Sequence, residues 1–345
     1  MALAAACALV VAVPRTASAE DVACTVNGEP FVGATVITGT SGNDDIQCPQ
    51  GLLPGLTINA GAGNDRIVVQ SPGQGLASNR GSINGESGND VIDILNTGLD
   101  ENGRGGDGST GTINGGTGDD EIFVLAANGR VTDDTVPGGV GGYGNTGTID
   151  GGGGNNTLTV QGGSGGRGGT SRDGGAGGAG NRGSIISAGS ITVIGGFGGN
   201  AGRPQFGTTP DSDGGEGGIG NDGTIRTRLL SGLNNQVSAY GGNGGFGLSN
   251  GEGGNGGDAN DETIVMTGTV TLKGGSGGDT RETGSEGGNG GNGNDGPLTV
   301  IGLLGSTSTG GNGGAGHPGG NGGLGASAGI TGLVTVTNGN PGPTT

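Results

Sequence analysis

The sequence lacks most of what an ordinary globular domain is built from. Only 2% of its 345 residues are aromatic, none is tryptophan, and there is a single histidine, His317. Beyond the N-terminus, no apolar run is long enough to cross a bilayer. These absences argue against a conventional large core, a membrane span and a catalytic site built around histidine. No zinc, phosphate-loop or dinucleotide-binding pattern is present, and the many Gly-x-Gly matches are accidents of the composition.

Basic residues are scarce as well. The 13 Lys and Arg face 31 Asp and Glu, which gives a formal net charge of −18. Such a chain should bind neither nucleic acid nor an anionic membrane surface, because it has no cluster of bases to neutralise phosphates. An acidic chain is suited to binding cations. The simpler interpretation, that the acids keep a glycine-rich chain soluble, stays open at this point.

The N-terminus is apolar and ends in a small-residue cleavage pattern at Ala19. This pattern is typical of a secretory signal peptide, so residues 1–19 are predicted to be removed on export. The mature chain is then expected to be secreted, extracellular or associated with the cell surface.

Cysteine is also rare. Of the three cysteines, Cys7 would leave with the signal peptide, so Cys24 and Cys48 remain as a pair in an oxidising compartment. We expect a disulfide between them rather than two free thiols. It would close a loop within an N-terminal cap, residues 20–56, and stabilise the fold by ~3 kcal/mol.

Glycine, in contrast, is abundant: 97 residues. Without a period, this composition indicates disorder. A period is present, however. The segment 79–83, Asn-Arg-Gly-Ser-Ile, recurs in close form at 145–149, 181–185 and 221–225. With looser copies the unit repeats about ten times, which is the signature of a repeat architecture.

Each unit holds two short runs that alternate apolar and polar residues, such as Ile92-Asp93-Ile94 and Leu158-Thr159-Val160. Alternation with β-branched residues indicates strands with one buried face. Two short strands cannot bury that face alone, but stacked copies can. We therefore predict an all-β fold, a β-solenoid of the parallel β-helix or β-roll type, with about ten coils and long glycine-rich insertions. No helix is expected outside the signal peptide.

A compact turn joins the two runs in the early units. Its copies are 39–46, 60–67, 85–92 and 115–122, and a fifth at 151–158 carries Asn156 where the others carry Asp. They fit the pattern G-G-x-G-x-D-x-U-x, in which the Asp comes two residues before a buried aliphatic residue.

Over roughly residues 36–160 these turns resemble the hemolysin-type calcium-binding repeats, the repeats-in-toxin (RTX) family. The resemblance implies that glycines shape a turn with exposed carbonyls and that stacked turns share Ca²⁺ through the Asp carboxylates. Calcium accepts such hard oxygen ligands. Carried over position by position, the metal-binding residues would be Asp44, Asp65, Asp90, Asp120, Gly61, Gly63, Gly85, Gly88, Gly116 and Gly118.

A purely structural interpretation of the same turns stays open. Asn and Asp tolerate the left-handed region and bond their own backbone, so Gly-Asn-Asp is also good turn chemistry. The turns recur here once per coil, at intervals of 21 to 36 residues, so only one edge of the coil could hold ions.

From about residue 161 the insertions read as Gly-Gly-X, for example GGNGG at 241–245. A period of three suits an extended helix of the polyproline type, and glycine lets such segments approach closely. Flexible surface loops are the alternative. This half is similar to the PGRS regions of mycobacterial surface proteins. Its composition is also similar to that of some glycine-rich ice-binding proteins. The flat threonine arrays of β-solenoid ice binders are not evident. Thr159, Thr192, Thr271 and Thr335 fall between apolar strand residues and would point outward, where they could form a threonine ladder or be ordinary strand residues.

The functional prediction is a secreted, calcium-binding structural or surface protein without catalysis. Calcium ions, and cell-surface or matrix polymers, are its expected partners. The alternative is a calcium-independent structural or adhesive protein, including one that binds ice or a glycan. A β-helix polysaccharide lyase is the remaining candidate, with Arg226, Arg228 and Lys273 as its available bases. The predicted organisation is 57–160 calcium-repeat-like solenoid, 161–340 solenoid with Gly-Gly-X excursions, and 341–345 tail.

Overall fold

The computed structural model describes residues 24–344, except 32–34, 133–135, 204–210, 229–234, 249, 281–283 and 302–304. The predicted signal peptide, residues 1–19, and the first residues of the predicted cap lie outside this part. Within the described residues every regular element is a strand, which confirms the all-β class. The same residues contain no helix of the length and hydropathy needed to cross a membrane.

The strands form two long sheets. Sheet A has the order β2-β1-β4-β6-β8-β10-β12-β14-β16-β18-β20-β22, and sheet B runs β3-β5-β7-β9-β11-β13-β15-β17-β19-β21. The strands of sheet A are β1 (Cys24–Val26), β2 (Glu29–Phe31), β4 (Asp45–Cys48), β6 (Arg66–Val69), β8 (Val91–Leu95), β10 (Glu121–Leu125), β12 (Asn156–Gln161), β14 (Gly189–Ile194), β16 (Gln236–Tyr240), β18 (Thr269–Lys273), β20 (Ser306–Thr309) and β22 (Val334–Thr337). Those of sheet B are β3 (Val36–Thr38), β5 (Thr57–Asn59), β7 (Ser82–Asn84), β9 (Thr112–Asn114), β11 (Thr148–Asp150), β13 (Ser184–Ser187), β15 (Thr224–Thr227), β17 (Ile264–Thr267), β19 (Leu298–Ile301) and β21 (Ile330–Thr331).

The repeat sets the register. Each unit contributes one strand to sheet B and then one to sheet A, and equivalent residues of successive units pair in parallel. Ile83 in β7, for example, lies between Ile58 and Ile113. All three side chains are fully buried, and the aliphatic residues of both sheets form one continuous core. The ten parallel strands of sheet B confirm the predicted solenoid of about ten coils.

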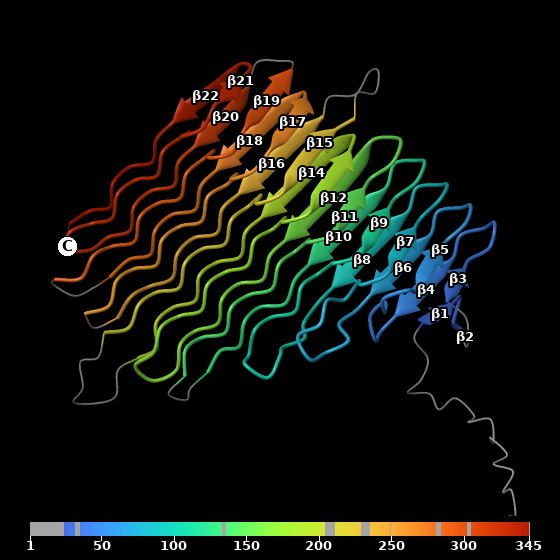
Figure 1. The fold of residues 1–345 in the computed structure, drawn as a ribbon, viewed down its shortest axis with the longest axis horizontal. Coiled ribbons are helices and arrows are strands. Elements are labelled where there is room, and N and C mark those ends of the chain that lie inside the picture. Colours follow the sequence, from blue (N-terminus) through green and yellow to red (C-terminus); the bar gives the residue numbers. More distant parts are fainter. Residues whose placement is uncertain are drawn as a thin grey trace, which may run out of the picture.

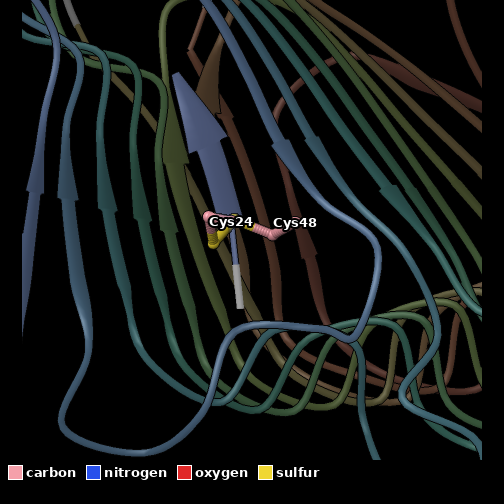
Figure 2. Close-up of a disulfide and its surroundings, with 2 residues drawn as sticks. All are labelled: Cys24 and Cys48. Atoms are coloured by element: carbon pink, nitrogen blue, oxygen red, sulfur yellow. A yellow bond between two sulfur atoms is a disulfide. The ribbon is translucent and has the colours of Figure 1, made fainter. Parts of the chain in front are cut away.

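The N-terminal end of sheet A is closed by an antiparallel hairpin, β1–β2, whose strand β1 pairs with β4. The predicted disulfide joins these two strands: Cys24 and Cys48 are bonded, with their Cα atoms 4.1 Å apart (Figure 2). Both cysteines are fully buried. The hairpin ends the stack with strands of a different direction, which is how solenoids commonly close their first coil.

Threonines line the outer face of sheet A as the sequence predicted. Thr159 of β12 pairs with Thr192 of β14, and the column continues through Ser238, Thr271, Thr307 and Thr335. These side chains are partly or fully exposed, because successive strand residues point to opposite faces of the sheet.

The glycine-rich excursions are ordered. Figure 1 shows the labelled strands gathered at one side of the molecule and the excursions running side by side away from them. Their backbone hydrogen bonds repeat every three residues. Within 162–169, Gly163 N donates to Gly142 O (2.8 Å) and Gly165 N donates to Phe197 O (2.7 Å). Each segment is thus bonded to one running in the opposite direction and to its counterpart in the next coil. Of the two interpretations that the sequence left open, the structure shows the ordered one.

The excursions make a slab of two layers. Segments that leave sheet A form the outgoing layer: 126–132, 162–170, 195–203, 241–248, 274–280 and 310–316. Segments that lead back toward sheet B form the return layer: 138–144, 174–180, 214–220, 253–259, 287–293 and 319–325. The two glycines of each triplet face neighbouring segments, and the third residue points outward.

Side chains at the third position continue the hydrogen bonding. Asn243 Oδ1 accepts a hydrogen bond from Ser276 N (2.8 Å) in the next coil, and Asp173 Oδ1 accepts one from Asp213 N (2.9 Å). A short side chain with an acceptor oxygen therefore satisfies the outward N–H of the neighbouring segment. This accounts for the frequent asparagine in the Gly-Gly-X triplets.

Glycine in the slab is required by backbone contact. A Cβ added to Gly199 would lie 2.6 Å from the carbonyl carbon of Gly166 and nearer still to its oxygen. We expect Gly199→Ala to destabilise the slab by about 1–3 kcal/mol or more, because the neighbouring backbone has to shift. Urea unfolding followed by circular dichroism would measure it. The control is Gly329→Ala, where a Cβ meets nothing within 4 Å. Equal stability of the two variants would contradict the packing described here.

Candidate metal centre in the aspartate turns

The candidate site lies in the turns that lead from sheet B to sheet A. Gly116 and Gly118 have φ values of 107° and 129°, in the left-handed region where glycine is favoured. The equivalent residues in the turns 60–67, 85–92 and 151–158 behave alike: Gly61 (110°), Gly63 (118°), Gly88 (130°), Gly152 (78°), Gly154 (104°) and, as the exception to glycine, Glu86 (71°). The first turn differs, because Thr40 and Gly42 do not have positive φ values. Of the six glycines predicted to bind metal, five lie in the left-handed region and Gly85 does not.

The structure brings the four predicted aspartates into one buried column. The side chains of Asp44, Asp65, Asp90 and Asp120 are between 1% and 3% exposed. In the last three of them, Oδ1 accepts a hydrogen bond from the backbone N–H of the preceding aspartate: Asp44 N to Asp65 Oδ1 is 2.8 Å, and Asp90 N to Asp120 Oδ1 is 3.0 Å. Asp65 N bonds Asp90 in the same way, at 2.8 Å. One oxygen of each carboxylate thus has a structural role.

The other oxygen has no partner in three of the four. Oδ2 of Asp65, Asp90 and Asp120 is buried without a hydrogen bond. A Cβ placed on Gly115 would lie 2.5 Å from Asp120 Oδ2 and 2.7 Å from Gly151 O, so these two acceptors face the same small space. Gly85 has the corresponding relation to Asp90 Oδ2 and Gly115 O. Two buried acceptors beside the same space need a hydrogen-bond donor or a cation there.

Asp44, in the first turn, is different. Its Oδ2 accepts hydrogen bonds from Thr40 N (2.6 Å) and Thr40 Oγ1 (3.0 Å), and its Oδ1 accepts one from Asn27 Nδ2 (2.6 Å). Burial raises the pKa of Asp44, but these hydrogen bonds outweigh it and hold the pKa below its usual range. This carboxylate is satisfied by the protein itself, so the unpartnered set is Asp65, Asp90 and Asp120.

The carboxyl groups of the other three aspartates in the column ionise less readily than that of an ordinary Asp. Burial is the main cause that raises the pKa of Asp65, Asp90 and Asp120, and neighbouring carboxylates add to it. The pKa of Asp90, which lies between two charged neighbours, is raised to about 6. A cation at this column would relieve both effects, because it favours the charged form of each carboxyl group.

The asparagine of Gly-Asn-Asp has a structural role, but it bonds the next coil and not its own backbone. Asn43 Oδ1 accepts a hydrogen bond from Asn64 N (2.8 Å), and Asn64 Oδ1 accepts one from Asn89 N (2.9 Å). The series continues through Asp119 to Asn155 on the exposed side of the turn. Gly61 O and Gly116 O also accept N–H groups of the next coil. The free oxygens are therefore concentrated on the inner, aspartate side.

A second acidic cluster was missed by the sequence analysis. Asp258, Asp261 and Asp295 each offer a carboxylate oxygen, and these atoms lie within 4.8 Å of one another. Asn292 donates to Asp258 from its backbone N and to Asp295 from its Nδ2. Asp261 Oδ1 is buried without a partner. Burial, followed by the charges of Asp258, Asp295 and Asp222, raises the pKa of Asp261 to about 7.

The repeats did contain a signal for this cluster. Asp222, Asp261 and Asp295 each follow the asparagine of the recurring unit, so an alignment of the units puts them in one column. The asparagines themselves form a buried amide ladder, in which Asn221 Nδ2 donates to Asn260 Oδ1 (2.7 Å) and Asn260 Nδ2 to Asn294 Oδ1 (2.8 Å). Asp258 comes from the return layer, and its distance from Asp261 depends on the slab, which the sequence left open.

The bases considered for a lyase come from both sheets. Arg226 lies in β15 of sheet B and Lys273 in β18 of sheet A. Arg228 makes an ion pair with Asp150 at 2.5 Å.

No family model and no curated protein matches this sequence. A solved structure that is similar in part is the nine polyproline type II helical bundle springtail antifreeze protein from Granisotoma rainieri. It is 23% identical, and the alignment covers 64% of this chain and 94% of that one, with a TM-score of 0.14. At that score the similarity carries no argument about fold or function.

The raised pKa values predict how stability depends on pH without divalent cations. In the folded chain Asp90 and Asp261 keep their protons to about pH 6 and about pH 7, whereas an unfolded Asp loses its proton near pH 3.9. The folded state therefore binds more protons in this window, and the free energy of unfolding should fall as the pH rises from about 4 to about 7. Urea unfolding in a chelator at several pH values measures this, and a rise over the same window would contradict it.

Proposed function

We propose that this chain is a secreted structural protein of the cell surface or extracellular matrix, and that Ca²⁺ bound in its aspartate turns stabilises the solenoid. The observation that carries the calcium proposal is the set of buried, unpartnered Oδ2 atoms of Asp65, Asp90 and Asp120. The predicted signal peptide and the buried disulfide support export, since disulfides persist in oxidising compartments.

The chain's own residues prepare this column for a cation. The Oδ1 hydrogen bonds fix the orientation of each carboxylate, so every Oδ2 is held on the same side of its turn. Gly85 and Gly115 leave the space that a Cβ would fill, and Gly115 O and Gly151 O face into it. Ala60 occupies the equivalent position in the second turn, so we assign the better sites to Asp90 and Asp120. A bound Ca²⁺ would supply positive charge against the stacked carboxylates.

Calcium would then act by linkage. An ion that binds the folded coil and not the unfolded chain raises the free energy of unfolding, by about 2.7 kcal/mol per site at a hundred times its dissociation constant. Extracellular repeats of this kind bind weakly, on the order of 10⁻⁴ to 10⁻³ M. The solenoid would therefore be most stable after export, where calcium is abundant.

The first test is thermal unfolding of the mature chain, residues 20–345, at neutral pH. We expect millimolar Ca²⁺ to raise the melting temperature by several degrees relative to chelator, since each occupied site adds to the unfolding free energy. Mg²⁺ is the control for general charge screening, because it demands octahedral geometry and gives up its water reluctantly. An identical melting temperature in Ca²⁺ and in chelator would overturn the calcium proposal.

The second test determines whether a cation or a proton occupies the space beside the unpartnered Oδ2 atoms. Asp90→Asn keeps the acceptor oxygen for Asp65 N and offers an amide donor toward Gly115 O. We expect this variant to be as stable as the wild type or more so in chelator at about pH 8, and to lose part of the calcium response. The matched control is Asp119→Asn, an exposed acid of the neighbouring turn whose acceptor role asparagine can fill. A full calcium response in Asp90→Asn would show that the ion binds elsewhere.

A further inference from the structure

The outward positions of the slab are sorted by charge. On the return layer, counting the residue directly before each segment, they include six acids: Asp173, Asp213, Glu216, Glu252, Asp258 and Glu286. On the outgoing layer, counted in the same way, the charged residues among the described outward positions of 161–343 are Arg167, Arg203 and Lys273 with a single acid, Asp279. In a chain with 31 acids and 13 bases, this separation gives the outgoing face a sign opposite to that of the whole protein.

The same face carries aromatic side chains in a row. Phe197 and Phe246 are 53% and 48% exposed, in a chain where only 2% of residues are aromatic. The backbone bond from Gly198 N to Asn243 O (2.8 Å) sets Phe197 level with Asn243, midway between Tyr240 and Phe246. With a rise of ~3.1 Å per residue, the three rings follow one another at steps of about 9 Å along the segments.

Polar groups surround this row. A hollow of about 260 Å³ lies beside Phe246, and its other lining residues are Arg167, Asn200, Ala201, Arg203, Gly247 and Leu248. Lys273 is exposed next to Tyr240, to which it is paired between β18 and β16. Cationic side chains thus lie near both ends of the aromatic row, with the amide of Asn243 between them.

We propose that this aromatic row, Tyr240–Phe197–Phe246 with Arg203 and Lys273, binds a linear polysaccharide that contains uronic acids. Aromatic rings offer apolar faces on which sugar rings stack, and exposed aromatic residues in soluble proteins commonly mark binding sites. A row with regular steps along the segments, even with Phe197 on the neighbouring segment, fits an extended polymer with a repeating ring. The cations complement its carboxylates.

The slab also holds these side chains on a rigid backbone, which favours binding of such a ligand. The rings project from segments that are hydrogen-bonded on two sides, so little conformational freedom is lost on binding. The acids of the return layer project from the opposite side, and salt screens charges over about 8 Å at physiological ionic strength. This proposal goes beyond the calcium proposal and does not depend on it, because backbone bonds hold the face.

The test uses the mature chain and oligogalacturonates, titrated by calorimetry in chelator so that calcium cannot crosslink the sugar. We expect saturable binding by the wild type. Phe197→Ala/Phe246→Ala should weaken it by about tenfold or more, since the variant removes two stacking surfaces. The matched control, Leu324→Ala, removes a side chain that is 48% exposed on the return layer and should bind as the wild type does. Circular dichroism confirms that all variants are folded.

A second arm separates stacking from charge. Arg203→Gln/Lys273→Gln should weaken binding of the acidic oligomers and reduce its salt dependence, and neutral β-glucan oligomers should bind more weakly than the acidic ones. The proposal is wrong if the wild type binds no oligogalacturonate, or if the double phenylalanine variant binds as tightly as the control. It is also wrong if that variant changes only the oligomeric state in size-exclusion chromatography, which would assign the row to self-association.

Discussion

The whole molecule depends on the parallel register between successive coils. Because equivalent residues stack, the isoleucines of sheet B form one buried column, the aspartates of the turns a second and the buried asparagines a third. Stacking concentrates whatever chemistry a position carries. For isoleucine the result is a core, and for asparagine it is an amide ladder in which each side chain satisfies the next. For aspartate the result is a line of like charges. This explains why the carboxyl groups of the aspartate turns have raised pKa values.

The slab is also held together by the stacking of equivalent segments, although it has no core of side chains. Its segments have almost no side chains to bury, so they are held by hydrogen bonds to segments on two sides and by close backbone contact. The sheets and the slab are therefore parts of one stack. Each coil passes through a core in which aliphatic side chains exclude water. It then passes through the slab, in which closely packed glycine backbone does so. A chain with 28% hydrophobic residues can form both the sheets and the slab for this reason.

The repeat made the solenoid predictable from the sequence. The alternation around Ile83 indicated which residues face inward, and the recurrence of the unit indicated that they stack. The disulfide followed from the two cysteines that remain once the predicted signal peptide is removed. The sequence did not show whether the Gly-Gly-X excursions are ordered. The hydrogen-bond partners of Gly163 N and Gly165 N lie 21 and 32 positions away, and no local pattern specifies them. Asp258, Asp261 and Asp295 were missed for the same reason, since their proximity requires the slab to be in place. The sequence also could not show that Thr40 and Asn27 satisfy Asp44 while the other three aspartates keep a free oxygen.

The three-residue period of the slab has a consequence for how such a chain can vary. A segment lengthened by one Gly-Gly-X triplet keeps every glycine facing a neighbour, whereas a change of one or two residues turns side chains into spaces that only glycine fits. An outgoing segment and the return segment bonded to it must also change together. The width of the slab is therefore adjustable in whole triplets while the solenoid stays the same, so one scaffold can present outward faces of different breadth.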